Sequence, residues 1–253
     1  MKLVAAMIVR NELGRYLRPC VESLLTFCDE VRVYDDGSDD GSREWLQAQE
    51  RVAVTATAGT HFFEHEGRAR NAALRWAMKG APTHLLAVDA DEFVSDGQAV
   101  RAACDEDAGR GVWALGMQEV WKADAGNLWL RIDGGWRAQE AGIPILWRAP
   151  PARVAQTGAW QIPDRALACG REPLAVRRLG RPIRVPADVL HFGWTDENDR
   201  ARRYARYVEH DGGRFHRSQH LDSIMWPDRR VRLKRRHWPP GLDREAIIPK
   251  AAA

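Results

Sequence analysis

The first hundred residues alternate short apolar runs with segments that repeat an apolar side chain every three or four positions. Residues 3–9 and 31–36 are predicted strands, a third run begins at Val52, and a fourth covers Thr83–Phe93. The segments between them, among them residues 15–28 and 67–79, have helical spacing. Parallel strands joined by crossover helices produce this alternation, so we predict an α/β fold with a mostly parallel central sheet flanked by helices.

The pattern changes after about Asp96, where Trp-rich pieces broken by Gly and Pro predict mixed or antiparallel strands with long loops. A further strand is expected over Val185–Trp194, then a polar surface helix over residues 196–211 and a basic tail. No repeat or low-complexity linker separates the halves. We therefore expect one domain, in which residues 1–95 and residues 96–253 share one sheet.

Composition excludes a disordered or membrane-spanning chain, because 45% hydrophobic and 29% charged residues lie in the usual globular range. No apolar stretch approaches the roughly 20 residues of a membrane span. The opening MKLVAAMIVRNE is charged too early for a signal peptide. We expect a cytoplasmic protein, with four reduced and mostly buried thiols at Cys20, Cys28, Cys104 and Cys169.

The formal charge of +3 gives the whole molecule no strong electrostatic preference. One cluster stands out, the segment RRVRLKRRH over Arg229–His237. It could face phosphates, an acidic acceptor or an anionic membrane surface, which would make the protein membrane-peripheral. A solvated tail without a ligand is the alternative.

Polar side chains follow each of the four strands predicted in the first half. In an open parallel sheet, ligands bind in the crevice beyond the carboxyl ends of the strands. We therefore expect these side chains to converge on one site: Arg10, Asn11, Glu12, Asp35, Asp36, His61, Asp89 and Asp91.

The segment VDADEF ends a predicted buried strand with Asp89 and Asp91. Two carboxylates at this spacing can reach one divalent cation, and hard oxygen ligands suit Mg²⁺ or Mn²⁺, which usually share their coordination with substrate phosphates. A diphosphate would be the natural partner. By itself the spacing is equally typical of a capped turn at a strand end.

Two further segments have both a functional and a structural interpretation. In YDDGSDDGS, a carboxylate at the strand end can accept the imide N–H of uracil, although an Asp/Gly turn that caps the next helix has the same sequence. In GRARNAAL, Arg70 lies early in a predicted helix, where a guanidinium can approach a base or phosphates. An exposed helical arginine is the alternative.

Taken in order, MIVRNELGRYLRPCVESLLTFCDEVRVYDDGSDDGS, GRARNAAL and LLAVDADEF resemble the donor half of family-2 glycosyltransferases with the GT-A fold. The resemblance covers about the first 95 residues. It implies that residues 1–95 bind a nucleotide sugar and that residues 96–253 form a mixed-strand acceptor half. The similarity is greatest to the branch that modifies surface polysaccharides or lipopolysaccharide cores, and to phage-encoded relatives.

The resemblance implies roles by position. Asp36 matches the aspartate that contacts uracil, with Asp35 beside it, and Arg70 matches the arginine of the donor site. Asp89 and Asp91, on either side of Ala90, match the metal-binding motif. Main-chain atoms near Met7–Arg10 would border the ribose and base, which places Val9, Arg10 and Asn11 in the donor site.

The second half departs from the family pattern. The nearest match to the family's acceptor-side base is AWQIPD, in which Asp164 would take the acceptor proton, with Asp124, Asp133, Glu140 and Asp188 as rivals. His191 ends the strand in ADVLHFGW. Some GT-A enzymes use a histidine there as an additional metal ligand, although a lone histidine is also typical of a structural hydrogen bond.

These features predict transfer of a sugar from a nucleoside diphosphate sugar, UDP-linked, to an acceptor hydroxyl, assisted by Mn²⁺ or Mg²⁺. The family resemblance favours inversion, whereas a metal-binding His191, which also occurs in retaining relatives, would weaken that preference. The acceptor could be a glycan, a lipid-linked sugar, a protein or modified DNA. A sugar nucleotidyltransferase remains an alternative, but it should carry a Gly-rich basic loop where this chain has IVRNELGRY. A DNA-modifying or nucleic-acid-binding phage-type protein is the other, suggested by the basic cluster and the aromatic residues.

Overall fold

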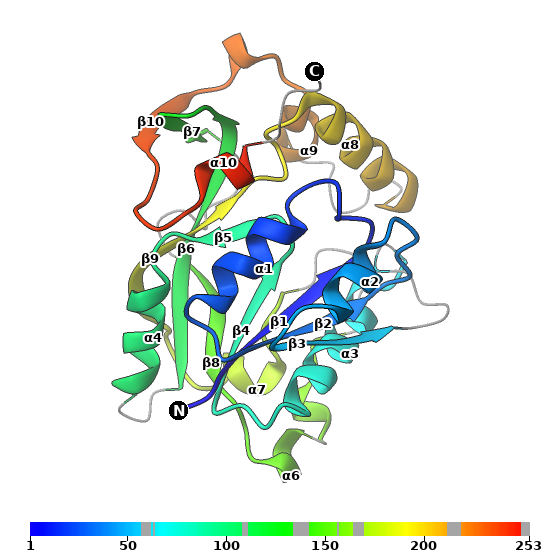
Figure 1. The fold of residues 1–253 in the computed structure, drawn as a ribbon, viewed down its shortest axis with the longest axis vertical. Coiled ribbons are helices and arrows are strands. Elements are labelled where there is room, and N and C mark those ends of the chain that lie inside the picture. The colour runs from blue at the N-terminus through cyan, green and yellow to red at the C-terminus, as the bar shows by residue number, and fades with distance from the viewer. Residues whose placement is uncertain are drawn as a thin grey trace.

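Ten strands form one sheet at the centre of the molecule (Figure 1). This is a computed structural model, and it describes residues 1–56, 62, 64–107, 111–133, 142–155, 157–163, 170–211 and 219–248. Eight of the strands follow the order β10-β7-β6-β8-β4-β1-β2-β3. The other two lie off this row, where β9 pairs with β6 and also with β5. Strands of both halves thus share one sheet.

The first half supplies the parallel part of the sheet. Its strands are β1 (Leu3–Val9), β2 (Glu30–Asp35), β3 (Val52–Ala56) and β4 (His84–Asp89). β1 lies between β2 and β4 and is parallel to both. The predicted parallel sheet is confirmed, and the carboxyl ends of these strands meet at one edge.

The predicted strand Thr83–Phe93 is wrong in one respect, because it divides into two. β4 ends at Asp89, and β5 (Glu92–Val94) pairs with β9 (Ile183–His191) instead. The break has a local cause. Asp89 is the last residue of β4, and its N–H donates to Oε2 of Glu92, the first residue of β5, at 2.9 Å, which closes a tight turn between the two strands.

The second half supplies β6 (Val112–Ala123), β7 (Asn127–Arg131), β8 (Ile143–Arg148) and β10 (Leu233–His237). β8 is antiparallel to both β4 and β6, and β9 runs parallel to β6. The expectation of mixed strands is confirmed. The basic cluster is not a solvated tail, because its residues 233–237 are β10, the edge strand that pairs with β7.

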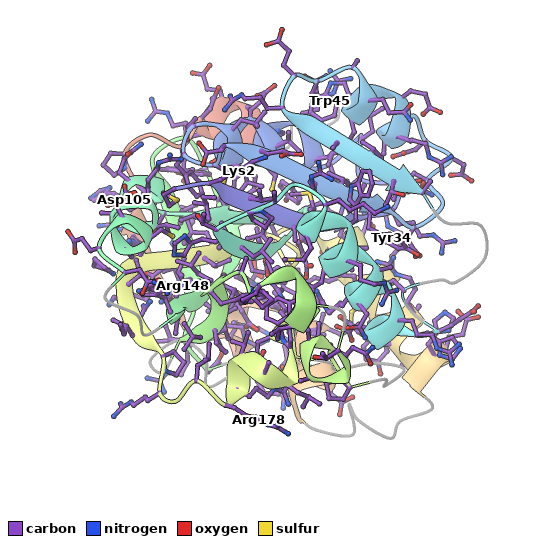
Figure 2. The ribbon with its side chains drawn as sticks, turned by 90° about the horizontal axis from the view of Figure 1, so that it is seen from below. Lys2, Tyr34, Trp45, Asp105, Arg148 and Arg178 are labelled. Atoms are coloured by element: carbon purple, nitrogen blue, oxygen red, sulfur yellow. The ribbon has the colours of Figure 1, made fainter. Side chains whose placement is uncertain are left out.

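Helices cover both faces of the sheet. α1 (Leu17–Leu25) and α4 (Gly97–Asp105) pack on the face that carries Leu3, Ala5 and Met7. α3 (Glu66–Met78) packs on the other face, and α2 (Ser42–Gln47) contacts β3. Figure 2 labels Tyr34 beside α3, where it packs on Ala69 and Ala73.

The sequence pattern did not predict α4, although Asp96 caps it by accepting the Ala99 N–H. The described residues of the second half also contain several short helical turns. They are α6 (Ala152–Ala155), α7 (Leu174–Arg177), α9 (Gln219–Ile224), α10 (Arg244–Ile247) and two 3₁₀ turns, Gly158–Trp160 and Asp228–Arg230.

α8 (Glu197–Asp211) is the polar helix that we expected on the surface, but it is only partly exposed. Its Tyr204 and Tyr207 pack on a small core around Trp121 and Trp194. Figure 1 shows α8 near the loop that follows β1, where Arg15 pairs with Asp199 at 2.7 Å. The helix therefore closes over the carboxyl edge of the parallel strands.

Three of the four cysteines behave as expected. Cys20, Cys28 and Cys104 are buried free thiols, while Cys169 lies outside the described residues. In the described part of the chain, no helix has both the length and the apolar character needed to cross a membrane.

Candidate functional site

Hydrogen bonds connect the loop after β1 to the Asp/Gly turn after β2. Asn11, which has a positive φ of 55°, donates from Nδ2 to Asp39 at 2.8 Å and accepts the Asp39 N–H at 2.9 Å. The Asn11 N–H donates to Ser38, and the Leu13 N–H donates to Asp40. The turn thus shapes the loop that carries Arg10 and Asn11, in addition to leading into α2.

Asp35 and Asp36 are both fully buried but have different partners. Arg43 donates to the Asp35 carboxylate from Nε at 2.8 Å. The Asp36 N–H donates to the Val9 carbonyl at 2.8 Å, and its Oδ2 accepts the Phe62 N–H at 2.8 Å. Arg10 lies 3.6 Å from the same oxygen. Asp35 anchors its own turn, whereas Asp36 lies against the loop after β1.

Arg70 lies on the second turn of α3 and points toward the end of β4. Its Nε donates to Glu66 at 2.7 Å, and its terminal nitrogen lies 3.3 Å from Oδ1 of Asp89. Its guanidinium also lies over the Phe62 ring, 5.1 Å from the centroid. Phe62 also donates its N–H to Asp36. Asp36 and Arg70 therefore both contact Phe62, Asp36 at the backbone and Arg70 at the ring.

The two aspartates that flank Ala90 form ion pairs with arginines. Asp89 pairs with Arg70 and, at 2.9 Å, with Arg171. Burial disfavours its ionised form, but Arg171 and Arg70 outweigh burial and lower the pKa of Asp89. Ala90 itself is buried in the main core.

Asp91 is 4% exposed and pairs with Arg203 of α8. His191 Nε2 lies 3.6 Å from the same carboxylate oxygen, Oδ2. Burial opposes the charge of Asp91, yet Arg203 and His191 hold its pKa well below the usual range. The predicted approach of His191 to Asp91 is therefore present in the fold.

Glu92 was not singled out in the sequence, although it is the most buried acid of the segment Asp89–Glu92 at 1% exposure. Arg171 donates to both of its oxygens and to Asp89, so one guanidinium neutralises two acids. Neither Arg171 nor Arg203 belongs to a recognisable motif. No signal in the sequence identified them.

His191 ends β9 between two acidic neighbours in the sheet. It is the register partner of Glu92 on β5 and of Glu119 on β6. Burial opposes its positive charge, but Asp91 outweighs burial and raises the pKa of His191. Glu119 is 4% exposed, and its Oε2 has no hydrogen-bond partner among the described residues. Burial is the main reason that the pKa of Glu119 is raised.

Gly193 leaves a small space between these groups. A Cβ atom added there would lie 2.6 Å from His191 Nε2, 2.8 Å from Asp91 Oδ2 and 2.9 Å from the central carbon of the Arg203 guanidinium. Real Cβ atoms do not approach heavy atoms this closely. Glycine is therefore the residue that lets His191, Asp91 and Arg203 meet.

The donor set near Asp91 fits a divalent cation in part. Two ligand atoms that share an ion at ~2.1 Å can be at most ~4.2 Å apart. The 3.6 Å between Asp91 Oδ2 and His191 Nε2 satisfies this limit. No cluster of three or more His, Cys, Asp or Glu side chains in the described chain has the arrangement of a metal site, so further ligands would have to come from substrate or water.

Glu12, in the loop after β1, joins this edge of the sheet. It pairs with Arg15 at 2.7 Å, and Arg15 in turn reaches Asp199 on α8. Burial raises the pKa of Glu12 to about 7 despite Arg15. The loop after β1 is thus tied to α8 as well as to the Asp/Gly turn.

The acceptor-side base cannot be placed. Asp164 and Glu140 lie outside the described residues. The other three rivals have structural partners. Asp124 accepts N–H groups of the β6–β7 turn, Asp133 pairs with Arg131, and Asp188 pairs with Arg184 and Arg236.

A cavity of about 500 Å³ lies beneath α3, away from the Asp89–Asp91 turn. Arg68, Asn71 and Arg75 line it from the helix, and Gln161 and Ile162 line it from the segment that leads toward Asp164. Asn71 fixes this segment, because its side chain exchanges two hydrogen bonds with the Ile162 backbone.

Residues 5–109 match the family model described as "Glycosyl transferase family 2". No curated protein matches the chain. The crystal structure of S. aureus TarS 1-349 is similar, with a TM-score of 0.52 and 17% identity over 89% of this chain and 69% of that one. At this identity the likeness shows the fold alone.

Two other solved structures are more distant. Glucosyl-3-phosphoglycerate synthase from Mycobacterium tuberculosis, in complex with Mn²⁺, UDP and phosphoglyceric acid, has a TM-score of 0.34 and 16% identity, over 47% of this chain and 43% of that one. A 4-diphosphocytidyl-2C-methyl-D-erythritol synthase has a TM-score of 0.44 and 18% identity, over 74% and 90%. Neither likeness is close enough to bear on function.

Proposed function

We propose that this chain, whose residues 5–109 match the model of glycosyl transferase family 2, is a GT-A glycosyltransferase and that its donor is a UDP-sugar bound with Mn²⁺ or Mg²⁺. The observation that carries the proposal is the convergence of Asp36, Arg70, Asp89, Asp91 and His191 at one edge of the sheet. These residues come from three strand ends and one helix.

The nucleoside would lie between the loop after β1 and α3. Main-chain atoms of Val9 and Arg10, with the neighbouring Asn11, would border this space. Asp36 would accept the imide N–H of uracil, because its carboxylate is held at the strand end by the Phe62 N–H. Arg70 would contact the base or the phosphates, since its guanidinium lies between Phe62 and Asp89.

Asp91 and His191 would hold the divalent ion, with Asp89 beside them and Gly193 providing the space. When bound, such an ion neutralises the charge that develops on the leaving diphosphate, a Lewis-acid effect of several kcal/mol. Asp89 and Asp91 stay ionised because arginines lower their pKa values, so both can serve as anionic ligands. Arg171 would keep Asp89 and Glu92 in place.

Inversion at the anomeric carbon requires a base on the acceptor side, and we propose Asp164 for this role. Asp164 would take the proton of the acceptor hydroxyl on the face opposite the diphosphate. Asp164→Asn preserves the shape of the side chain and removes the proton acceptor, so turnover should fall by about 10²- to 10⁴-fold while UDP binding persists. A product that keeps the anomeric configuration of the donor would rule out this role.

The acceptor is proposed to be a glycan, a lipid-linked sugar, a protein or modified DNA. The exposed cations Arg232, Lys234 and Arg235 lie on or beside the edge strand β10 and could contact an anionic acceptor or membrane surface. This would fit a cytoplasmic, membrane-peripheral enzyme.

The donor proposal is tested by calorimetry of UDP binding with Mn²⁺ and with EDTA, in the wild type and in Asp91→Ala. We expect tight binding only in the wild type with Mn²⁺. Hydrolysis of a panel of nucleotide sugars in the presence of Mn²⁺ would then identify the sugar. Equal UDP affinity in all conditions would remove the metal from the proposal.

A further inference from the structure

Arg203 and His191 contact the same oxygen of Asp91. Arg203 donates to Asp91 Oδ2, and His191 Nε2 lies 3.6 Å from that oxygen. The space beside Gly193 is within 2.9 Å of His191 Nε2, Asp91 Oδ2 and the Arg203 guanidinium carbon. A cation that binds Asp91 and His191 together would therefore meet Arg203.

Arg203 uses only part of its hydrogen-bonding capacity. Its Nε is buried and has no hydrogen-bond partner among the described residues. Its guanidinium also lies 5.5 Å from the centroid of the Trp194 ring. A buried guanidinium with an unused donor is suited to an additional anionic partner, because guanidinium groups bind phosphates through paired donors.

The acids at the Asp89–Asp91 turn are already paired with arginines in the structure. Asp89, Asp91 and Glu92 face the guanidinium groups of Arg70, Arg171 and Arg203. A divalent cation alone would add positive charge to this partly buried site, and a nucleoside diphosphate alone would add negative charge. Uncompensated buried charge is costly, so the site favours binding the two together.

We propose that Arg203 holds the cation position at Asp91 in the donor-free protein and moves to the donor diphosphate when the metal ion binds. This inference rests on the proposed donor site. The movement required is short. A phosphate oxygen that shares an ion with Asp91 lies within ~4.2 Å of the carboxylate oxygen that Arg203 already contacts.

If Arg203 moves from Asp91 to the diphosphate, one substitution at Arg203 should strengthen Mn²⁺ binding and weaken UDP binding. Removing the Arg203 guanidinium frees Asp91 for Mn²⁺ and removes a ligand from the diphosphate. Arg203→Gln should therefore bind Mn²⁺ alone at least about tenfold more tightly than the wild type, and UDP in saturating Mn²⁺ at least about tenfold more weakly. A purely structural arginine would not strengthen metal binding.

The experiment uses the full chain and two probes, Mn²⁺ alone followed by electron paramagnetic resonance, and UDP in saturating Mn²⁺ followed by calorimetry. Arg202→Gln is the matched control, because Arg202 is the neighbouring residue on α8 and its side chain is 68% exposed. It should change neither affinity. Circular dichroism checks the fold, and if Arg203→Gln does not fold, Arg203→Lys should show smaller changes of the same signs.

Three outcomes would overturn the inference. Unchanged affinities in Arg203→Gln would show that Arg203 is structural, provided that the wild type binds UDP with Mn²⁺. Weaker UDP binding without stronger Mn²⁺ binding would assign Arg203 to the phosphates and reject the movement from Asp91. If the wild type binds neither probe, the donor site itself is wrong and the inference fails with it.

Discussion

His191 Nε2 lies 3.6 Å from Asp91 Oδ2, which joins the end of β9 to the turn between β4 and β5. The contact depends on sheet pairing, because Glu92 of β5 is the register partner of His191. A short motif in the first half and a lone histidine in the second half thus form one group of ligand atoms. The first prediction tests the space between them.

Gly193→Ala should abolish tight Mn²⁺ binding in the presence of UDP. The added methyl group would lie within 2.8 Å of both Asp91 Oδ2 and His191 Nε2, where the ion is proposed to bind. We expect at least a tenfold loss of Mn²⁺ affinity, measured by titration with UDP present. Gly158→Ala is the control, because a Cβ there meets no atom within 4 Å. Wild-type Mn²⁺ affinity in Gly193→Ala would place the metal elsewhere.

Asp36→Asn should weaken UDP binding about tenfold or more. The substitution keeps the size of the side chain but replaces a charged acceptor by an amide, and hydrogen bonds to charged groups contribute about 1.5–3 kcal/mol. Calorimetry with Mn²⁺ present measures the effect, and thermal unfolding checks that the fold persists. Asp105→Asn, at the exposed end of α4 labelled in Figure 2, serves as a control. If both variants bind UDP like the wild type, Asp36 does not contact the nucleoside.

Arg171→Met should destabilise the protein by about 3–5 kcal/mol, because removing one member of a buried ion pair leaves the other charge uncompensated. Arg171 donates to both carboxylate oxygens of Glu92, and Glu92 is 1% exposed. Urea denaturation measures the free energy of unfolding. Arg178→Met removes an exposed arginine, labelled in Figure 2, and should cost little. Equal stabilities of the two variants would show that Arg171 does not neutralise the acids.

Glu119→Gln should remove a pH-dependent loss of stability. The folded-state pKa of Glu119 is raised, chiefly by burial, so its contribution is fully present below the unfolded-state pKa and is lost as pH rises through the folded-state pKa. At pH 8 the variant should therefore be more stable than the wild type by about 1–3 kcal/mol. At acidic pH, below both pKa values, the difference should vanish. Urea denaturation at both pH values measures it, with exposed Glu22→Gln as control.

Neutralising Arg232, Lys234 and Arg235 together should weaken binding to an anionic acceptor, and added salt should weaken binding by the wild type. All three side chains are exposed, so the fold and donor hydrolysis should be unchanged. Arg236 is left in place because it pairs with Asp188 at 2.9 Å. Acceptor binding that is independent of salt and of these residues would leave β10 a purely structural edge strand.

Local sequence predicted the elements of the first half well because these elements carry their own signals. β1 has the bounds that the apolar run indicated, and α3 differs from the predicted helix by one residue at each end. Asp36, Arg70 and Asp89 converge as expected, since parallel strands bring their carboxyl ends to one edge of the sheet. The break between β4 and β5 was not predicted, because two strands that follow each other closely in the sequence have the same pattern as one long strand.

The strand within the basic cluster was not predicted, because strand pairing has no signature in a run of cations. Lys234 and Arg235 are exposed on β10, as they would be in a solvated tail, and only the pairing with β7 distinguishes the two. An edge strand tolerates charge on both faces, and charged edges prevent further pairing. The polar pattern of α8 likewise gave no sign that the Arg203 side chain is mostly buried, with 16% of it exposed.

The sequence by itself determined the α/β architecture of the first half and the residues at its strand ends, because periodicity and capping are local properties of the chain. Only the tertiary structure decided which cations meet the acids. Arg171 precedes α7 and Arg203 lies on α8, and each forms an ion pair with an acid of the Asp89–Asp91 turn. Ion pairs between distant segments depend on distance in space, which neither spacing nor composition encodes.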